Sequence, residues 1–420
     1  MTKPSQPARG AESTYAWVRL VVSMLLMTIG GSGMYGVTVA LPLIQQEFDV
    51  ARSTASLPYA LTMIGFGVGG ILMGRMSDRF GAMVPVIIGA VGLGAGYIAA
   101  GFAASLWQFS LAQGVLIGLL GTSATFAPLV ADVSHWFNRR RGIAVALCAS
   151  GNYVAGAFWP PVMQHFFESA GWRATYIAIG VFSVLAAVPL AWVLRRRAPV
   201  YQWTAAEASH AKVSEPSPKT LGLSPGALQT LLCVAGVGCC VAMSMPQVHI
   251  VAYCGDLGYA AARGAEMMSL MLGFGIVSRL ASGWLSDRIG GVRTLLANSV
   301  LQCTALVLFL PSDQLTALYL ASALFGLFQG GLIPSYAIIV REYFPAREAG
   351  WRTGTVIMAT LFGMALGGWM AGAIFDVTGS YRASFFNAIQ WNLLNMAIAF
   401  FLLRRSRRAH IASRVVVKAN

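Results

Sequence analysis

The stretch Gly-Arg-Met-Ser-Asp-Arg-Phe-Gly at 74–81 returns later in the chain as Gly-Trp-Leu-Ser-Asp-Arg-Ile-Gly at 283–290. The acids of the two copies, Asp78 and Asp287, are 209 residues apart, which is half of the 420-residue chain. Each copy ends one long apolar segment and is followed by another. A repeated charged loop between hydrophobic segments predicts two parallel copies of one membrane unit.

The repeat extends beyond this tract. Arg173 and Arg382 follow the same pattern and are also 209 residues apart. The aromatic pairs Trp136-Phe137 and Tyr343-Phe344 are 207 residues apart. The sequence separations between the repeated residues agree within two residues, which chance does not readily explain. We therefore expect two pseudo-symmetric bundles.

The composition is that of a membrane protein. The chain is 57% hydrophobic and only 10% charged, whereas a soluble domain carries about 25% charged residues. Apolar segments of about 20 residues predict twelve transmembrane helices, near 17–41, 55–74, 82–103, 108–134, 142–166, 174–194, 226–252, 264–285, 292–310, 315–340, 353–375 and 383–403. We therefore expect an all-α protein with an N-terminal tail (1–16), a six-helix bundle (17–195), a linker (196–225), a second bundle (226–403) and a C-terminal tail (404–420).

The positive charge follows the predicted topology. Of the 29 Lys and Arg residues, 24 fall in the loops on the side of the two termini; the opposite loops hold Arg52, Arg173, Arg263 and Arg382, and Arg279 lies inside a span. The positive-inside rule places both termini in the cytoplasm, and we expect a bacterial cytoplasmic (inner) membrane. The net charge of +14 is thus topological, and no soluble basic face predicts nucleic-acid binding.

The two tracts resemble the loop motif between helices 2 and 3 of the major facilitator superfamily. The matching residues are Gly74, Asp78, Arg79 and Gly81 in one copy, and Gly283, Asp287, Arg288, Gly290 and Arg293 in the other. An acid beside a helix end can accept hydrogen bonds from the first N–H groups of a neighbouring helix, which makes a conformational latch. The resemblance implies that Asp132 pairs with Arg75 or Arg79, and that Glu342 pairs with Arg288. Static ion pairing is the alternative.

Arg279 is the charge that a membrane span should not contain. It lies eight residues before Asp287, or about 12 Å along a helix, and an arginine near a helix centre costs about 2.5–3.5 kcal/mol to insert. No acid lies within a turn of it on the same helix. Guanidinium binds carboxylates in a bidentate manner, so we expect an anionic substrate. The alternative is that Arg279 pairs with carbonyls or with an acid on another helix.

Other polar or aromatic residues at membrane depth are candidates for contacts with the same substrate. His249 could also titrate near neutral pH, although a packed, hydrogen-bonded histidine is an equal alternative. The remaining candidates are Tyr35, Phe126, Asn152, Gln247, Gln329, Tyr336, Asn387 and Trp391. Asn387 and Trp391 are four residues apart and share a helix face.

The segment from Trp136 to Gly151 resembles the second signature of the monocarboxylate transporter family: an aromatic pair, a basic cluster and a helix of small residues that ends in Gly. That family and the related oxalate/formate antiporter hold the substrate carboxylate with an arginine on helix 8, so the resemblance implies that Arg279 is this ligand. The chain departs from the family where an Asp that couples protons is replaced by Gly275, and where lysines of helices 1 and 11 are missing.

These observations predict a secondary transporter of a small organic anion, most simply a monocarboxylate, because a single cation suits one carboxylate. Proton symport with His249, anion exchange and uniport stay open. The rival interpretations are a carrier of a drug or sugar with a structural Arg279, and a receptor or sensor. No nucleotide-binding loop, catalytic set or metal-ligand spacing occurs, so we expect no enzyme and no cofactor. The expected partners are the carboxylate, protons and the lipid bilayer, with a monomer as the functional unit.

Overall fold

The computed structural model describes residues 13–137, 140–196, 221–311 and 313–419. These residues form helices and contain no strand. In chain order the elements are α1 (Thr14–Glu47), α2 (Arg52–Ala55), α3 (Leu57–Phe80), α4 (Met83–Gly101), α5 (Leu106–Leu111), a π-helical segment (Ala112–Thr122), α6 (Ala127–Trp136), α7 (Arg141–Ala170), α8 (Trp172–Trp192), a 3-10 turn (Val193–Arg195), α10 (Pro225–Asp256), α11 (Ala261–Ile289), α12 (Gly291–Leu308), α13 (Leu315–Gln329), α14 (Leu332–Tyr343), α15 (Ala346–Thr378) and α16 (Tyr381–Ala419).

Twelve helical spans within the described residues are long and apolar enough to cross a membrane. The predicted all-α membrane fold with twelve spans is therefore confirmed. Several spans are longer than predicted, and the first reaches from Thr14 to Glu47. Most of the predicted linker (196–225) and of the N-terminal tail (1–16) lies outside the described residues.

The chain divides into two compact units. The first comprises Met1–Val37 and Ile64–Glu215, and the second comprises Thr38–Met63 and Pro216–Asn420. The last third of α1, α2 and the first third of α3 thus belong to the second unit, although most of α1 and α3 belongs to the first. The predicted bundle boundaries at 17–195 and 226–403 stay a prediction.

The repeat seen in the sequence returns in the local geometry of each unit. Gly81 ends α3 with φ 84°, and Gly290 ends α11 with φ 86°. These backbone angles favour glycine because a Cβ is strained there. The glycine that closes each repeated tract is therefore required by the turn into the next span.

The two repeated arginines also occupy equivalent places. Arg173, at the start of α8, donates to the carbonyl oxygens of Gly101 and Ala103 just after α4, at 2.9 and 2.8 Å. Arg382, at the start of α16, donates at 2.5 Å to Asp313 in the loop after α12. In each unit this arginine ties the sixth span to the end of the third span.

Spans 4 and 10 are interrupted at matching positions, which the sequence analysis did not anticipate. In span 4 the π-helical segment ends at Thr122 and α6 begins at Ala127, and in span 10 α13 ends at Gln329 and α14 begins at Leu332. A proline follows each break, Pro128 in span 4 and Pro334 in span 10, 206 residues apart. Paired interruptions in two related halves are a good pointer to a solute site in transporters.

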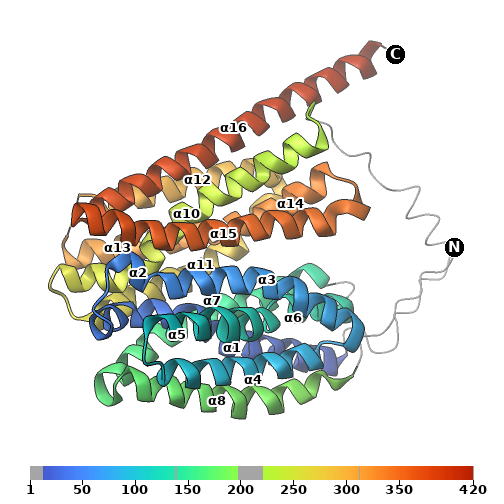
Figure 1. The fold of residues 1–420 in the computed structure, drawn as a ribbon. Coiled ribbons are helices and arrows are strands. Elements are labelled where there is room, and N and C mark those ends of the chain that lie inside the picture. Colours follow the sequence, from blue (N-terminus) through green and yellow to red (C-terminus); the bar gives the residue numbers. More distant parts are fainter. Residues whose placement is uncertain (1–12, 138–139, 197–220, 312, 420) are drawn as a thin grey trace. The chain divides into compact units, whose positions relative to one another are not determined.

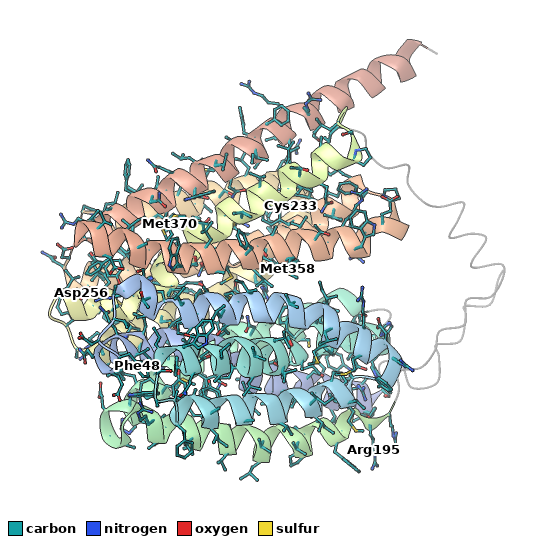
Figure 2. The ribbon with its side chains drawn as sticks, viewed as in Figure 1. Phe48, Arg195, Cys233, Asp256, Met358 and Met370 are labelled. Atoms are coloured by element: carbon teal, nitrogen blue, oxygen red, sulfur yellow. The ribbon has the colours of Figure 1, made fainter. Side chains whose placement is uncertain are left out.

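The second unit is built around α10. This helix packs against α15 and α16, and α11 packs against α13 (Figure 1). Asp256 marks the last residue of α10 in Figure 2, and Cys233 lies about two turns from its other end. Because α11 starts directly after the Asp256 end and runs back, Asp287 lies at the opposite end of the unit from Asp256.

Candidate solute site and conformational contacts

Arg279 lies on α11, on the side of the helix that faces its neighbours. Its side chain is partly exposed, whereas Val277 and Trp284 form part of an exposed apolar strip, with 53% and 57% of their surface accessible. At about 100° per residue these two lie roughly 160° and 140° around the helix from Arg279. Arg279 therefore points away from the apolar strip and not into it.

The helix that carries Arg279 presses against the break in span 10. A Cβ at Gly330 would lie 2.3 Å from the Gly275 carbonyl oxygen and 3.1 Å from the Arg279 backbone nitrogen. A Cβ at Gly331 would lie 2.0 Å from the Ser282 hydroxyl. The two glycines thus let the interruption between α13 and α14 lie directly on the backbone of α11, next to the backbone of Arg279.

Three other predicted residues of the second unit, Gln247, Gln329 and Tyr336, make buried hydrogen bonds. The Gln247 side chain donates to the Gln329 amide oxygen at 3.0 Å, and both residues are buried. The Tyr336 hydroxyl donates at 2.9 Å to Asn395, which in turn donates at 2.8 Å to Ser299. Gln247 and Gln329 therefore act together at the end of α13, while Tyr336 belongs to a buried polar chain with α12 and α16.

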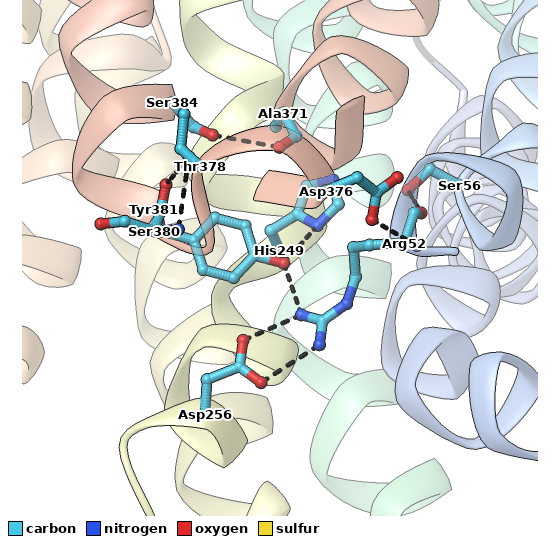
Figure 3. Close-up of polar contacts among 10 residues, drawn as sticks. All are labelled: Arg52, Ser56, His249, Asp256, Ala371, Asp376, Thr378, Ser380, Tyr381 and Ser384. Atoms are coloured by element: carbon cyan, nitrogen blue, oxygen red, sulfur yellow. Dashed lines mark hydrogen bonds and ion pairs between the residues drawn. The ribbon is translucent and has the colours of Figure 1, made fainter. Parts of the chain in front are cut away.

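His249 is fully buried and held on both ring nitrogens. Nδ1 lies 2.8 Å from the Tyr381 hydroxyl, and Nε2 lies 2.7 Å from the Gly368 carbonyl oxygen (Figure 3). Any contact between His249 and a substrate or an incoming proton requires these two hydrogen bonds to rearrange.

The other predicted contacts are divided between the units. Asn387 and Trp391 lie on α16 of the second unit and are partly buried. Tyr35, Phe126 and Asn152 belong to the first unit, where Tyr35 is buried and the other two are partly buried. Seven of the ten predicted substrate residues therefore belong to the second unit: Arg279, His249, Gln247, Gln329, Tyr336, Asn387 and Trp391.

The repeated tracts place their charges on the surface. Asp78, Arg79, Asp287 and Arg288 are all exposed. The Arg288 guanidinium lies 3.8 Å from the centre of the Trp284 ring, so this cation is held by an aromatic face. The latch role of these four residues stays a prediction.

The expected partner of Asp132 is wrong. Both of its carboxylate oxygens are bound by Arg19, through Nε at 2.6 Å and Nη2 at 2.8 Å, and not by Arg75 or Arg79. Arg19 is 1% exposed and also donates to the Leu194 carbonyl oxygen at 3.2 Å. It lies on α1 within the span Thr14–Glu47, so Arg279 is not the single arginine inside a span.

Glu342 also has a different partner from the one expected. Its carboxylate accepts the backbone N–H of Gly291 at 2.9 Å, at the start of α12. A carboxylate at the start of a helix satisfies a free N–H group and complements the helix dipole. The helix-end contact predicted for the repeated acids therefore exists in this unit, but Glu342 makes it.

The described residues include no group of three or more His, Cys, Asp or Glu placed to hold a metal ion. The six cysteines are unpaired, and four of them are buried.

Comparisons with known proteins agree with this arrangement. The sequence profile of the Major Facilitator Superfamily matches residues 21–313 and 267–418. Monocarboxylate transporter 13 of Rattus norvegicus is 28% identical over 334 residues, or 79% of this chain and 74% of the relative. The MFS-type transporter pynF of Aspergillus niger is 25% identical over 368 residues, or 86% of this chain and 82% of the relative. A crystal structure of the peptide transporter POT with sulfate superposes with a TM-score of 0.72 at 13% identity, covering 93% of this chain and 94% of that one, so this likeness concerns the fold alone.

Proposed function

Because the chain belongs to the Major Facilitator Superfamily, we propose that it is a secondary transporter of a small organic anion, and specifically of a monocarboxylate. The family and the curated relatives are transporters, so the chain is a membrane transporter and not an enzyme.

One observation carries the choice of an anion: the backbone of α11 at Arg279 lies against Gly330, two residues before the start of α14. The N-terminal end of a helix carries partial positive charge and free N–H groups. Arg279 adds a full positive charge to the helix whose backbone touches the break in span 10. In transporters the N-termini of broken helices bind anionic groups of the substrate. An arginine and a helix N-terminus together make a site that favours a carboxylate.

The number of charges favours one carboxylate over two. On α11 the nearest acids are Glu266 and Asp287, and Glu266 is bound by Arg263 and by the Tyr319 hydroxyl. Arg279 brings a single planar fork, which matches the two oxygens of one carboxylate. The name of the rat relative, a monocarboxylate transporter, agrees with this choice.

The transport cycle that we propose is alternating access. The substrate carboxylate binds Arg279, and Gln329 with its partner Gln247 adjoins this position at the end of α13. The exposed pairs Asp78–Arg79 and Asp287–Arg288 serve as latches on the side of the termini, while Glu342 holds the start of α12 and Asp132 holds Arg19. The distribution of Lys and Arg supports cytoplasmic termini in an inner membrane. Proton symport and anion exchange are the two modes of coupling that we consider, with a monomer as the functional unit.

Uptake into vesicles tests the proposal. Reconstituted wild-type protein should accumulate short monocarboxylates but not their neutral amides, and Arg279→Gln should lower the rate by about 10- to 100-fold, as expected for the loss of a charge-assisted bidentate contact. Arg263→Gln is the matched control, because Arg263 is on the same helix but is 52% exposed and pairs with Glu266. Equal transport of acids and amides, or undiminished uptake by Arg279→Gln, would contradict the proposal.

A further inference from the structure

Arg52 is a buried arginine at the start of α2, in the short connection between α1 and α3. It is 7% exposed. Its Nη1 and Nη2 donate to the two carboxylate oxygens of Asp256 at 3.0 and 3.1 Å, and Nη1 also donates to the Tyr381 hydroxyl at 2.7 Å (Figure 3). Asp256 is the last residue of α10 and Tyr381 is the first residue of α16. One side chain thus joins this connection to the ends of two spans.

A second acid holds the backbone of the same residue. Asp376, near the end of α15, accepts the backbone N–H groups of Arg52 and Ser53 on its two oxygens, each at 2.8 Å. These groups belong to the first turn of α2, where N–H groups have no partner within the helix. Because α2 has only four residues, the two hydrogen bonds to Asp376 account for much of what keeps it in place.

The hydrogen bonds continue from Tyr381 in one direction. The Gly368 carbonyl can only accept, so His249 Nε2 carries the hydrogen and Nδ1 accepts the Tyr381 proton. The Tyr381 oxygen in turn accepts from Arg52. Loss of Arg52 would therefore remove the donor to the Tyr381 oxygen, at one end of this path.

The surface beneath this connection is shaped for close contact. A Cβ at Gly368 would lie 2.7 Å from the Tyr59 ring, and one at Gly372 would lie 2.9 Å from the Arg52 backbone. Both glycines lie on α15, one turn apart. Residues 52–59 therefore lie directly on the α15 backbone, which only glycine allows at these two positions.

We propose that this cluster is a lock, which holds residues 52–59 on α10, α15 and α16 in one conformation of the transport cycle and releases them in the other. The chain itself supplies the reason. α1 runs without a break through Val37 and Thr38, and α3 runs through Met63 and Ile64, where the two units divide. A rearrangement of one unit against the other must therefore bend these continuous helices or open the contacts of Arg52. The lock does not depend on which solute is carried.

Chemical labelling of α2 tests the lock without any substrate. Ala55 lies on α2 and is 2% exposed, so Ala55→Cys should be shielded while the lock is closed. In a background that lacks the six native cysteines, the protein is placed in lipid vesicles and treated with a water-soluble maleimide. Arg52→Gln should raise the labelling rate of Ala55→Cys by about tenfold or more, because it leaves Asp256 and Tyr381 without their cation.

A second variant and a control keep the test decisive. Asp256→Asn preserves the volume of the side chain and should raise the rate in the same direction if Arg52→Gln does not fold. Arg263→Gln, which removes the exposed ion pair with Glu266, should leave the rate unchanged. The lock is excluded if Ala55→Cys is labelled as slowly in the Asp256→Asn protein, and in the Arg52→Gln protein where that folds, as it is without these substitutions. It is also excluded if Arg263→Gln raises the labelling rate of Ala55→Cys as much as they do.

Discussion

Arg52 and Arg279 both lie on spans of the second unit, yet their surroundings differ in kind. Arg52 is buried, and protein groups take up both terminal nitrogens of its guanidinium: Asp256 binds Nη1 and Nη2, and Tyr381 binds Nη1. Arg279 is partly exposed and lies against an interrupted span. The first arrangement joins parts of the protein to each other, whereas the second places an arginine on the helix that packs against an interrupted span.

This difference teaches that a charge within a span is not by itself a sign of a substrate site. Arg19 makes the same point in the first unit, because Asp132 and the Leu194 carbonyl bind it inside the protein. Exposure of the side chain and a nearby break in the backbone are the features that separate Arg279 from these two structural arginines.

Truncation of the two arginines should have opposite consequences. Arg52→Ala should destabilise the protein by about 1–3 kcal/mol, because the buried Tyr381 hydroxyl and the partly exposed Asp256 carboxylate would both lose their donor. Arg279→Ala should change stability by less than about 1 kcal/mol and act on transport instead. Thermal unfolding in lipid nanodiscs measures both, and an equal loss of stability for the two variants would remove the distinction between them.

A methyl group at the break in span 10 should disturb the packing of this break against α11, the helix that carries Arg279. Gly331→Ala places a Cβ 2.0 Å from the Ser282 hydroxyl, so α14 must move away from α11, at a cost of about 1–3 kcal/mol. Uptake of the carboxylate should fall together with thermal stability. Gly354→Ala is the control, because a Cβ there has no neighbour within 4 Å; a matching loss in the control would show that the space at Gly331 is not special.

Removal of the Tyr381 hydroxyl should weaken the Arg52 cluster but leave its other contacts in place. Tyr381→Phe keeps the aromatic contacts with Phe375 and Phe385, but takes the acceptor from Arg52 and the donor from His249. We expect a loss of stability of about 1–2 kcal/mol, smaller than that of Arg52→Ala. Unfolding curves of the single variants and of Arg52→Ala/Tyr381→Phe give the coupling between them, and strict additivity would argue against a connected cluster.

The repeated tract should give the smallest effect on stability. Asp287 is exposed at the end of α11, so Asp287→Asn should shift stability by no more than about 0.5 kcal/mol. If it is a latch, the transport rate should still change. A variant with both stability and transport unaltered would leave the tract with a topological role only.

The sequence was sufficient for the repeat, the twelve spans and the family, because these depend on local apolar segments and on spacing along the chain. It also placed Arg279 within the eighth span, on the same helix as Asp287. The glycine at the end of each tract, at the same position in both copies, is consistent with a turn that needs a positive φ angle. Gly81 and Gly290 both have such an angle.

The pairing of charges was beyond reach, because the partners are far apart in the chain. Arg52 meets Asp256 across 204 residues and Tyr381 across 329, and Arg19 meets Asp132 across 113. No local pattern encodes such contacts, and analogy with the superfamily led to the wrong partner for Asp132. The breaks in spans 4 and 10 were missed for a simpler reason: each span is apolar throughout, so hydropathy shows no interruption.

A thermal-shift comparison of wild-type protein and Arg279→Gln, across a series of small carboxylates, tests the central claim most directly. A ligand at a hundred times its Kd stabilises a protein by about 2.7 kcal/mol, which is readily measured. We predict that at least one monocarboxylate raises the unfolding temperature of the wild type and leaves Arg279→Gln unchanged. An equal shift in both proteins, or no shift with any acid, would contradict the assignment of Arg279 as the ligand of a carboxylate.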